Sequence, residues 1–203
     1  MPQVARLWPG ETVVVLGTGP SLTVEDVDYC RTKARVIAVN DAYHLAPWAD
    51  ALYGCDAQWW QWHRGVPEFT GPKWALDHSA WTKYRAIYPD VQRLRNTGWS
   101  GLEHLPTGLK SGRNSGYQAI NLAVHYGAAR ILLLGFDMQA AKDRSHFFGE
   151  HPNRQRSPYP LFRHAFDSLV KPLAKIGVVV LNCSRSTMLT AFPRVPLREA
   201  LPC

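Results

Sequence analysis

Glycine and polar residues follow several apolar runs of this sequence, and their types are those of a ligand-binding site. Gly17-Thr18-Gly19-Pro20-Ser21 comes directly after the apolar run 12–16. Glycines let the backbone approach a ligand closely, and the N–H groups of such a loop can bind an anion, although a plain structural turn explains the same residues. The loop is not a dinucleotide fingerprint, because Leu22 stands where its third glycine belongs.

Two more apolar runs end in polar residues. Asn40 and Asp41 follow the second run, and an asparagine offers both a donor and an acceptor to a base or a ribose, or closes an Asx turn. Asp56 follows the third run and could bind a metal, a ribose or a substrate hydroxyl, or cap the next helix.

Asn114-Ser115-Gly116 opens a predicted helix. We expect Ser115 to be the N-cap, and its hydroxyl and the first helix amides could equally meet a phosphate or a carboxylate. Asp137 ends the most apolar run of the chain and points toward the same rim.

The segment "RSHFFGEHPNRQR" carries the candidate acid–base groups. His146 and His151 lie five residues apart, but no cysteine or third histidine stands at metal-ligand spacing. A loop histidine with a pKa near ~6.5 is better placed as a general base. Arg144, with Arg154 and Arg156, could neutralise a diphosphate or a nucleic-acid backbone; a solvated basic loop is the alternative.

The elements that must position these residues alternate in type. Apolar runs at 12–16, 35–40, 49–56, 130–137 and 177–182 predict buried strands, and helices are expected at 24–30, 115–126 and 161–175. This alternation predicts a single doubly wound, Rossmann-like α/β domain over residues 1–203, with a mainly parallel sheet and ligands beyond the carboxyl ends of its strands. Residues 57–110 have weak periodicity and five tryptophans within 23 residues, so we expect an irregular insert or lid.

Composition sets the class of protein. The 203 residues carry a net charge of +7, which favours anionic partners. The sequence has no apolar run long enough for a membrane span and no signal-peptide pattern. Its four cysteines form no CxxC pair, so a reduced, cytoplasmic protein is expected.

Taken in order, these segments are more specific than any one of them. "VVVLGTGPSL", "VIAVND", "NSGYQAINLAVHYGAARILLLGFDM", "SHFFGEHPN" and "VVVLNCSRSTM" together resemble the small bacterial lipooligosaccharide sialyltransferases. The resemblance covers roughly residues 12–56 and 111–190. The 6-hydroxymethylpterin diphosphokinase-like family, with relatives widespread in phage genomes, is similar in its sheet and in its G-x-G-P-S-L loop.

The sialyltransferase resemblance implies inverting transfer of a sugar from a CMP- or other nucleotide-activated donor to the hydroxyl of a glycan or other acceptor, with no cofactor. The loop 17–21 and Asn40 would hold the nucleotide, Ser115 and Gly116 the donor sugar, and His151 would be the general base. Sialyltransferases stabilise the leaving phosphate with tyrosines. Met138 stands in one such place here, so Arg144 or Lys142 would act instead.

Other readings stay open. In a diphosphokinase-like transferase, Asp41, Asp56 and Asp137 would bind Mg²⁺ and ATP would donate the diphosphate. The basic charge also fits a non-catalytic nucleotide- or nucleic-acid-binding protein, or a glycosyltransferase whose acceptor is modified DNA.

Overall fold

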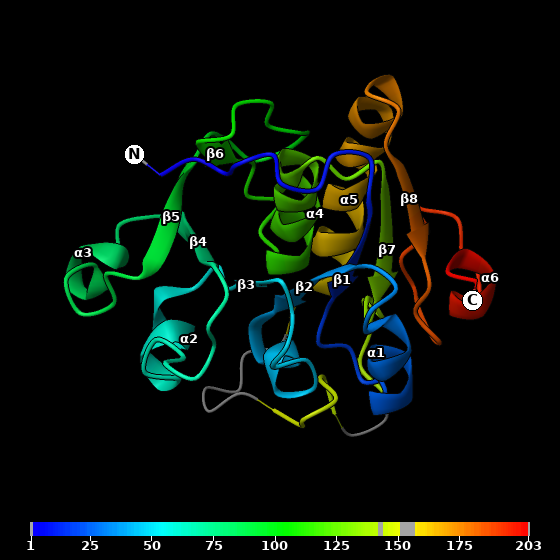
Figure 1. The fold of residues 1–203 in the computed structure, drawn as a ribbon, viewed down its shortest axis with the longest axis horizontal. Helices are drawn as coiled ribbons and strands as arrows, with labels where there is room; N and C mark the ends of the chain where they lie inside the picture. The colour runs from blue at the N-terminus through cyan, green and yellow to red at the C-terminus, as the bar shows by residue number, and fades with distance from the viewer. Residues whose placement is uncertain (1, 142–143, 151–156, 203) are drawn as a thin grey trace.

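The computed structural model describes residues 2–141, 144–150 and 157–202. Its strands form one sheet in the order β6-β5-β4-β3-β2-β1-β7-β8, and all neighbouring strands are parallel (Figure 1). The strands are β1 (Thr12–Leu16), β2 (Arg35–Val39), β3 (Ala51–Tyr53), β4 (Lys73–Asp77), β5 (Val91–Asn96), β6 (Gly108–Leu109), β7 (Arg130–Leu134) and β8 (Val179–Asn182).

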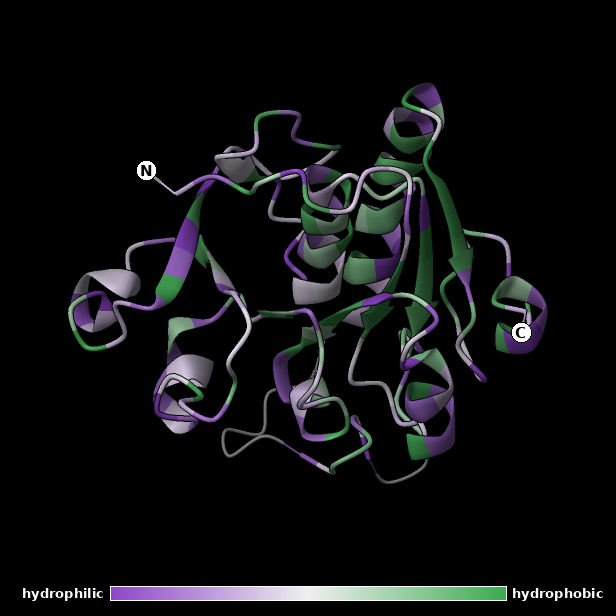
Figure 2. Cartoon of the chain, in the orientation of Figure 1, coloured by the Kyte–Doolittle hydropathy of each residue, from purple (hydrophilic) through white to green (hydrophobic). Residues whose placement is uncertain are grey.

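Helices cover both faces of the sheet, as the doubly wound prediction requires. Alternate residues of β1 belong to two separate hydrophobic clusters, because successive side chains point to opposite faces. One cluster packs under α4 (Ser115–Tyr126) and α5 (Tyr159–Lys175). The other packs against α1 (Val24–Cys30), the 3₁₀ turn η1 (Asn40–His44), α2 (Ala57–Trp62), α3 (Trp81–Tyr84) and α6 (Leu197–Ala200). Figure 2 shows the apolar strands β1, β7 and β8 between these layers.

The chain reverses its winding direction between β1 and β7. From β1 the sheet grows through β2 to β6 on one side, and the chain then returns to place β7 on the other side of β1. Leu16 pairs with Leu134, so the two strands end at the same level. Ligands of open α/β sheets bind at such a switch point, beyond the carboxyl ends of the strands.

Local capping sets where the helices begin and end. Thr23 caps α1, because its side chain accepts a hydrogen bond from the N–H of Asp26. Asn114 caps α4, because its side chain accepts from the N–H of Tyr117 at 3.1 Å; the prediction of Ser115 as the N-cap is wrong. Gly127 ends α4 in the left-handed conformation, with φ 104°.

Residues 57–110 are not the irregular insert that the sequence predicts. They contain α2, β4, α3, β5 and β6, and the three strands extend the sheet to one edge. Most of their tryptophans are core residues: Trp59, Trp60, Trp74 and Trp81 are at most 3% exposed. The periodicity is weak because charged residues flank the apolar residues of β4 and interrupt those of β5, and β6 has only two residues. No helix in the described ranges is long and apolar enough to cross a membrane.

Candidate functional site

A cavity of about 530 Å³ opens at the switch point. The loops after β1, β2, β3 and β7 line it together with the first turns of α4 and α5. Most of the predicted site residues meet there, namely Gly17, Thr18, Gly19, Asn40, Asp56, Asn114, Ser115, Gly116 and His146. The residues that the sequence singles out thus line one cavity, although the structure gives several of them contacts that the sequence did not predict.

The glycine loop packs against the end of β7 and does not form an open anion nest. The N–H groups of Gly17 and Gly19 donate to the carbonyls of Leu134 and Gly135, at 2.7 and 2.8 Å. A Cβ on Gly17 or Gly19 would lie 2.6 Å from the Gly135 oxygen, so both positions require glycine for close packing. The N–H groups of both glycines already donate within the chain, so they do not bind an anion. The loop instead forms a wall of the cavity, and the lack of side chains on Gly17 and Gly19 lets a ligand come close.

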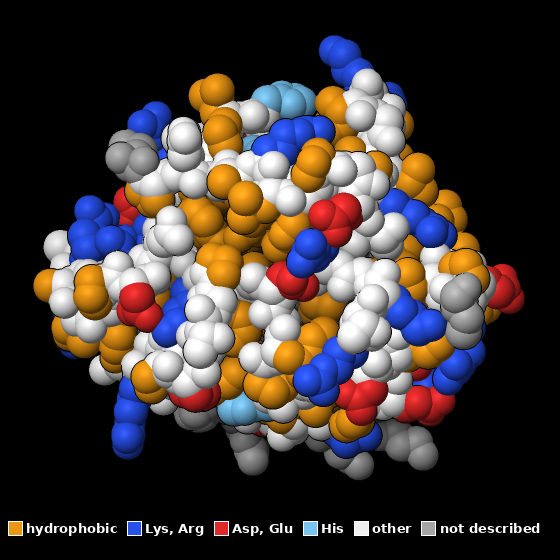
Figure 3. All heavy atoms as spheres, viewed as in Figure 1, with side chains coloured by type: hydrophobic (Ala, Val, Ile, Leu, Met, Phe, Trp, Pro, Cys, Tyr) orange, Lys and Arg blue, Asp and Glu red, His pale blue; other side chains and the backbone are white. Residues whose placement is uncertain are grey.

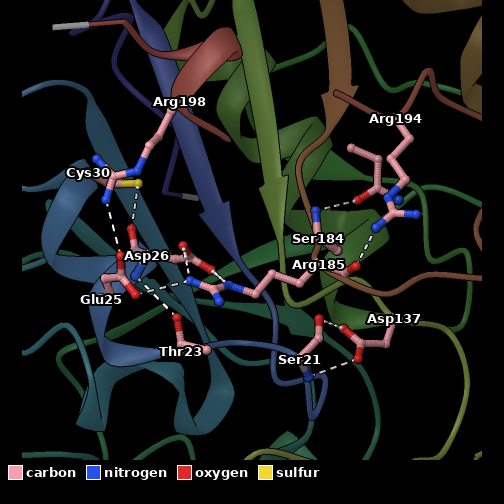
Figure 4. A network of polar contacts seen from close by, with 11 residues as sticks. Ser21, Thr23, Glu25, Asp26, Cys30, Asp137, Ser184, Arg185, Arg194 and Arg198 are labelled. Atoms are coloured by element: carbon pink, nitrogen blue, oxygen red, sulfur yellow. Dashed lines mark hydrogen bonds and ion pairs between the residues drawn. The ribbon is translucent and has the colours of Figure 1, made fainter. Parts of the chain in front are cut away.

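Asp137 supports this loop from outside the cavity. Its carboxylate accepts from the N–H and the hydroxyl of Ser21, at 2.9 and 2.7 Å (Figure 4). The side chain is only 2% exposed, and burial raises the pKa of Asp137 although the Ser21 bonds oppose that shift. Pro20, Ser21 and Asp137 do not line the cavity; they fix the shape of the loop that does.

The start of α4 differs from the glycine loop in its backbone N–H groups. Ser115 and Gly116 face the cavity, and as first-turn residues their N–H groups have no intrahelical acceptor. A Cβ on Gly116 would lie 2.6 Å from the ring of Phe136, so glycine lets the helix start close to β7. Arg113, which the sequence analysis missed, also lines the cavity and stacks on Trp99 with 4.8 Å from its guanidinium carbon to the ring centroid.

Asn40 presents an unused acceptor. Its backbone is left-handed, with φ 49°, a conformation that asparagine adopts more readily than most residues. The side-chain oxygen is buried and has no hydrogen-bond partner among the described residues. A buried carbonyl without a donor costs free energy, and a ligand donor in the cavity would remove that cost.

The three carboxylates that would bind Mg²⁺ in the diphosphokinase alternative do not lie together. Asp41 is buried and does not line the cavity; its carboxylate accepts from the Trp59 indole N–H at 2.9 Å. Asp56 lines the cavity and is exposed, whereas Asp137 is held by Ser21. The potential metal-ligand groups in the described part of the chain do not unite these three residues.

One of the two candidate histidines faces the cavity. The Nδ1 of His146 lies 2.9 Å from the hydroxyl of Thr18, and its ring stacks on Phe148 with 5.0 Å between centroids. His151 lies outside the described residues. Arg144 is exposed, pairs through its backbone with Ala141 and is not part of the cavity wall.

The cavity wall contains aromatic residues that the sequence analysis did not assign. Tyr159 begins α5 and lines the cavity, and burial raises the pKa of its hydroxyl. Trp59 and Trp62 line it from α2. A tyrosine just before a predicted helix was the available signal; the helix starts at Tyr159 and not at residue 161.

The positive charge is dispersed over the face drawn in Figure 3. Lys and Arg side chains there alternate with acidic and apolar ones and form no continuous stripe. Part of the charge is paired, because Arg185 binds Asp26 and Glu25 and so joins the segment after β8 to α1 (Figure 4). This face therefore lacks the continuous basic surface typical of nucleic-acid binding.

Comparisons with known proteins show the fold of this chain. No family model matches the sequence, and no curated protein matches it. The MAf glycosyltransferase from Magnetospirillum magneticum AMB-1 superposes with a TM-score of 0.66 at 15% identity, over 97% of this chain and 35% of that one. The chain thus spans about a third of that enzyme. The sialyltransferase CstII from Campylobacter jejuni, in complex with a substrate analogue, cytidine-5'-monophosphate, superposes with a TM-score of 0.54 at 15% identity. The match covers 92% of this chain and 85% of that one. This chain therefore has the fold of the sialyltransferase and of the matching third of the MAf enzyme.

Proposed function

We propose that this protein is an inverting glycosyltransferase that takes a sugar from a nucleotide-activated donor, with a CMP-sugar as the first candidate. The observation that carries the proposal is the buried, unpartnered side-chain oxygen of Asn40, a residue of the cavity wall that also includes the first residues of α4. The cavity lies at the switch point of a glycosyltransferase fold, and one neighbour of that fold is a sialyltransferase described with CMP.

The cavity offers separate places for the two halves of a nucleotide. The Asn40 oxygen would accept a hydrogen bond from an amino or hydroxyl group of the nucleoside, and the glycine loop lets that group come close. The phosphate would lie at the start of α4, where the N–H groups of Ser115 and Gly116 and the charge of Arg113 favour an anion.

In this proposal hydrogen-bond donors of the cavity stabilise the leaving phosphate, and no metal ion held by carboxylates is needed. The dispersed Asp41, Asp56 and Asp137 do not favour the diphosphokinase alternative. Tyr159 gives the cavity a hydroxyl donor, the kind of group that the resemblance implies for the departing phosphate. In this proposal Tyr159 replaces the expected roles of Arg144 and Lys142.

A histidine of the segment 146–151 would be the general base. It would take the proton of the acceptor hydroxyl while the oxygen attacks the anomeric carbon; the bond to the phosphate breaks and the nucleoside monophosphate leaves with both electrons. The resemblance implies His151 for this role. Because His146 lines the cavity and is oriented by Thr18, it is the second histidine to test.

The experiment measures release of CMP from a CMP-sugar donor in the presence of glycan acceptors, with each histidine replaced in turn. Loss of a general base lowers turnover by about 10²–10⁴-fold. We expect that loss in His151→Gln or His146→Gln, with donor binding kept. His164→Gln is the matched control, because His164 is an exposed residue of α5 whose side chain is 89% exposed. Full turnover in both variants would contradict the histidine base.

The same assay separates the other readings. Turnover that requires Mg²⁺ and ATP would contradict the proposal and favour the diphosphokinase alternative. Binding to DNA that weakens steeply with salt, without any transfer, would favour a nucleic-acid-binding protein. Transfer to modified DNA would keep the glycosyltransferase proposal and identify the acceptor class.

A further inference from the structure

Three side chains of types that can bind a metal ion lie close together outside the cavity lining. Asp41 and His44 lie on η1, and His63 directly follows α2. One ligand atom from each lies within 4.8 Å of the other two. Asp41 is buried, His63 is half-buried and His44 is exposed, so a cation could enter from solvent.

The Asp41–His63 pair already has the spacing of two ligands on one metal ion. The Oδ1 of Asp41 lies 3.2 Å from the Nε2 of His63. Ligands at ~2.0–2.1 Å from a tetrahedral Zn²⁺ stand about 3.3 Å apart, so this pair needs almost no rearrangement. His44 has an exposed side chain with freedom to rotate, and only its ring has to approach.

Neighbouring groups orient both ligands. The second carboxylate oxygen of Asp41 accepts from the Trp59 indole at 2.9 Å. The Nδ1 of His63 lies 3.2 Å from the hydroxyl of Tyr43. Burial and the adjacent Glu68 carboxylate raise the pKa of Tyr43, and Glu68 accepts from its hydroxyl. Such outer contacts fix the tautomer of a metal-binding histidine.

The two ring nitrogens of His63 have different neighbours. Its Nδ1 faces the Tyr43 hydroxyl and its Nε2 faces the Asp41 carboxylate. The ring is therefore held with Nε2 directed at the carboxylate, the atom pair that would bind one ion.

We propose that Asp41, His44 and His63 form a binding site for a borderline divalent cation, with Zn²⁺ as the first candidate. Two imidazoles and one carboxylate suit Zn²⁺ and not Mg²⁺, which prefers oxygen ligands, and a water would complete the coordination. The ion would link η1, which carries Asn40, to α2, which carries Trp59 and Trp62. It would thus hold one wall of the cavity, away from the reacting groups.

A second group of similar composition is less suited to a metal. Cys55, Asp56 and His78 also have ligand atoms within 4.8 Å of one another. Burial raises the pKa of the Cys55 thiol well above its ordinary value, so the thiolate that binds metals is disfavoured. The Nε2 of His78 lies 3.3 Å from the carbonyl oxygen of Cys55. His78 therefore serves as the matched control.

The test is calorimetric titration of the chelator-treated full chain with Zn²⁺, and separately with Mg²⁺, in the absence of nucleotide. We expect one Zn²⁺ per chain, no heat with Mg²⁺, and a melting temperature about 5–10 °C higher at 100-fold excess over the Kd. His44→Asn should weaken binding at least 10-fold, because even outer-shell changes cost 10–100-fold. His78→Asn should leave the affinity unchanged.

The exposed position of His44 keeps this test clear of folding effects, since replacing an exposed side chain leaves the core intact. Co²⁺ gives a second readout, because its visible absorption reports a four-coordinate site with nitrogen ligands. Absence of Zn²⁺ binding, or equal affinity in wild type and His44→Asn, would overturn the proposal and leave Asp41–His63 as a structural contact of η1 with α2. Because no nucleotide is present, either result is independent of the proposed glycosyltransfer.

Discussion

Replacing Asp137 separates support of the glycine loop from direct contact with a ligand. The Asp137 carboxylate accepts two hydrogen bonds from Ser21, at 2.9 and 2.7 Å. In Asp137→Ala both donors lose their charged acceptor. Hydrogen bonds to charged groups are worth about 1.5–3 kcal/mol each, and half-buried Ser21 recovers part of this from water. We therefore expect a loss of about 2–4 kcal/mol, or roughly 5–15 °C in melting temperature for a chain of this length.

Asp137→Asn is the matched isosteric variant. Its amide oxygen still accepts from the Ser21 N–H, and the Ser21 hydroxyl can rotate to accept from the amide. Because burial raises the pKa of Asp137, the folded state binds the proton more tightly than the unfolded chain. The stability from this group is present below the ordinary pKa of 3.8 and is lost as the pH rises through the raised value. Asp137→Asn should therefore gain stability relative to wild type between about pH 4 and pH 7.

The assays are denaturant unfolding across that pH range and nucleotide binding at neutral pH. Asp137→Asn should bind the nucleotide as wild type does, because Asp137 lies outside the cavity wall, whereas Asp137→Ala should bind it more weakly as the loop shifts. If Asp137→Asn folds normally but abolishes nucleotide binding, the carboxylate contacts the ligand or its metal directly. If Asp137→Ala is as stable as wild type, the supporting role is refuted.

Other substitutions test neighbouring parts of the account. Gly19→Ala should destabilise the chain and abolish nucleotide binding, because its Cβ would lie 2.3 Å from the Asp137 carboxylate; normal binding would contradict the close packing. Arg113→Gln should weaken nucleotide binding several-fold and reduce its salt dependence, measured by titration at two ionic strengths; an unchanged affinity would exclude Arg113 from the phosphate site. Burial would raise the pKa of Glu103, but hydrogen bonds from neighbouring N–H groups and nearby Lys110 hold it at about 2. Its stabilisation is present above pH ~4.5 and lost toward pH 2, so Glu103→Gln should cost about 1–2 kcal/mol at pH 7 and little at pH 2, by denaturant unfolding; an equal cost at both pH values would contradict it.

The central strands could be predicted from the sequence because they are buried on both faces. β1, β2 and β7 read as continuous apolar runs, which is typical of parallel strands in the middle of a sheet. β4 and β5 could not be predicted in this way, since they carry charged residues. Lys73 in β4, for example, is 5% exposed, and its ammonium group donates to Asp90 at 2.7 Å and to the backbone carbonyl of Gly65.

The grouping of the candidate site residues was predictable from the sequence, but their contacts were not. Ligands of parallel sheets bind beyond the carboxyl ends of the strands, and this rule predicts that Asn40 and Gly116 lie near each other. Both residues line the same cavity. The sequence could not show that the glycine-loop amides donate to β7, or that Asp41 turns toward Trp59, because those contacts depend on side chains and strands far apart in the chain. Arg113 was missed for the same reason, since its position depends on the loop that carries Trp99.

The most direct test of the central claim is calorimetric binding of CMP, without Mg²⁺, to wild type and to Asn40→Gly. Glycine keeps the left-handed backbone at this position, with φ 49° in the wild type, and removes only the side chain with its unpartnered oxygen. The account predicts that wild type binds CMP and that Asn40→Gly binds it about 3–10-fold more weakly, the value of one buried hydrogen bond. Equal affinity of the two proteins, or binding of Mg-ATP and not of CMP, would contradict it.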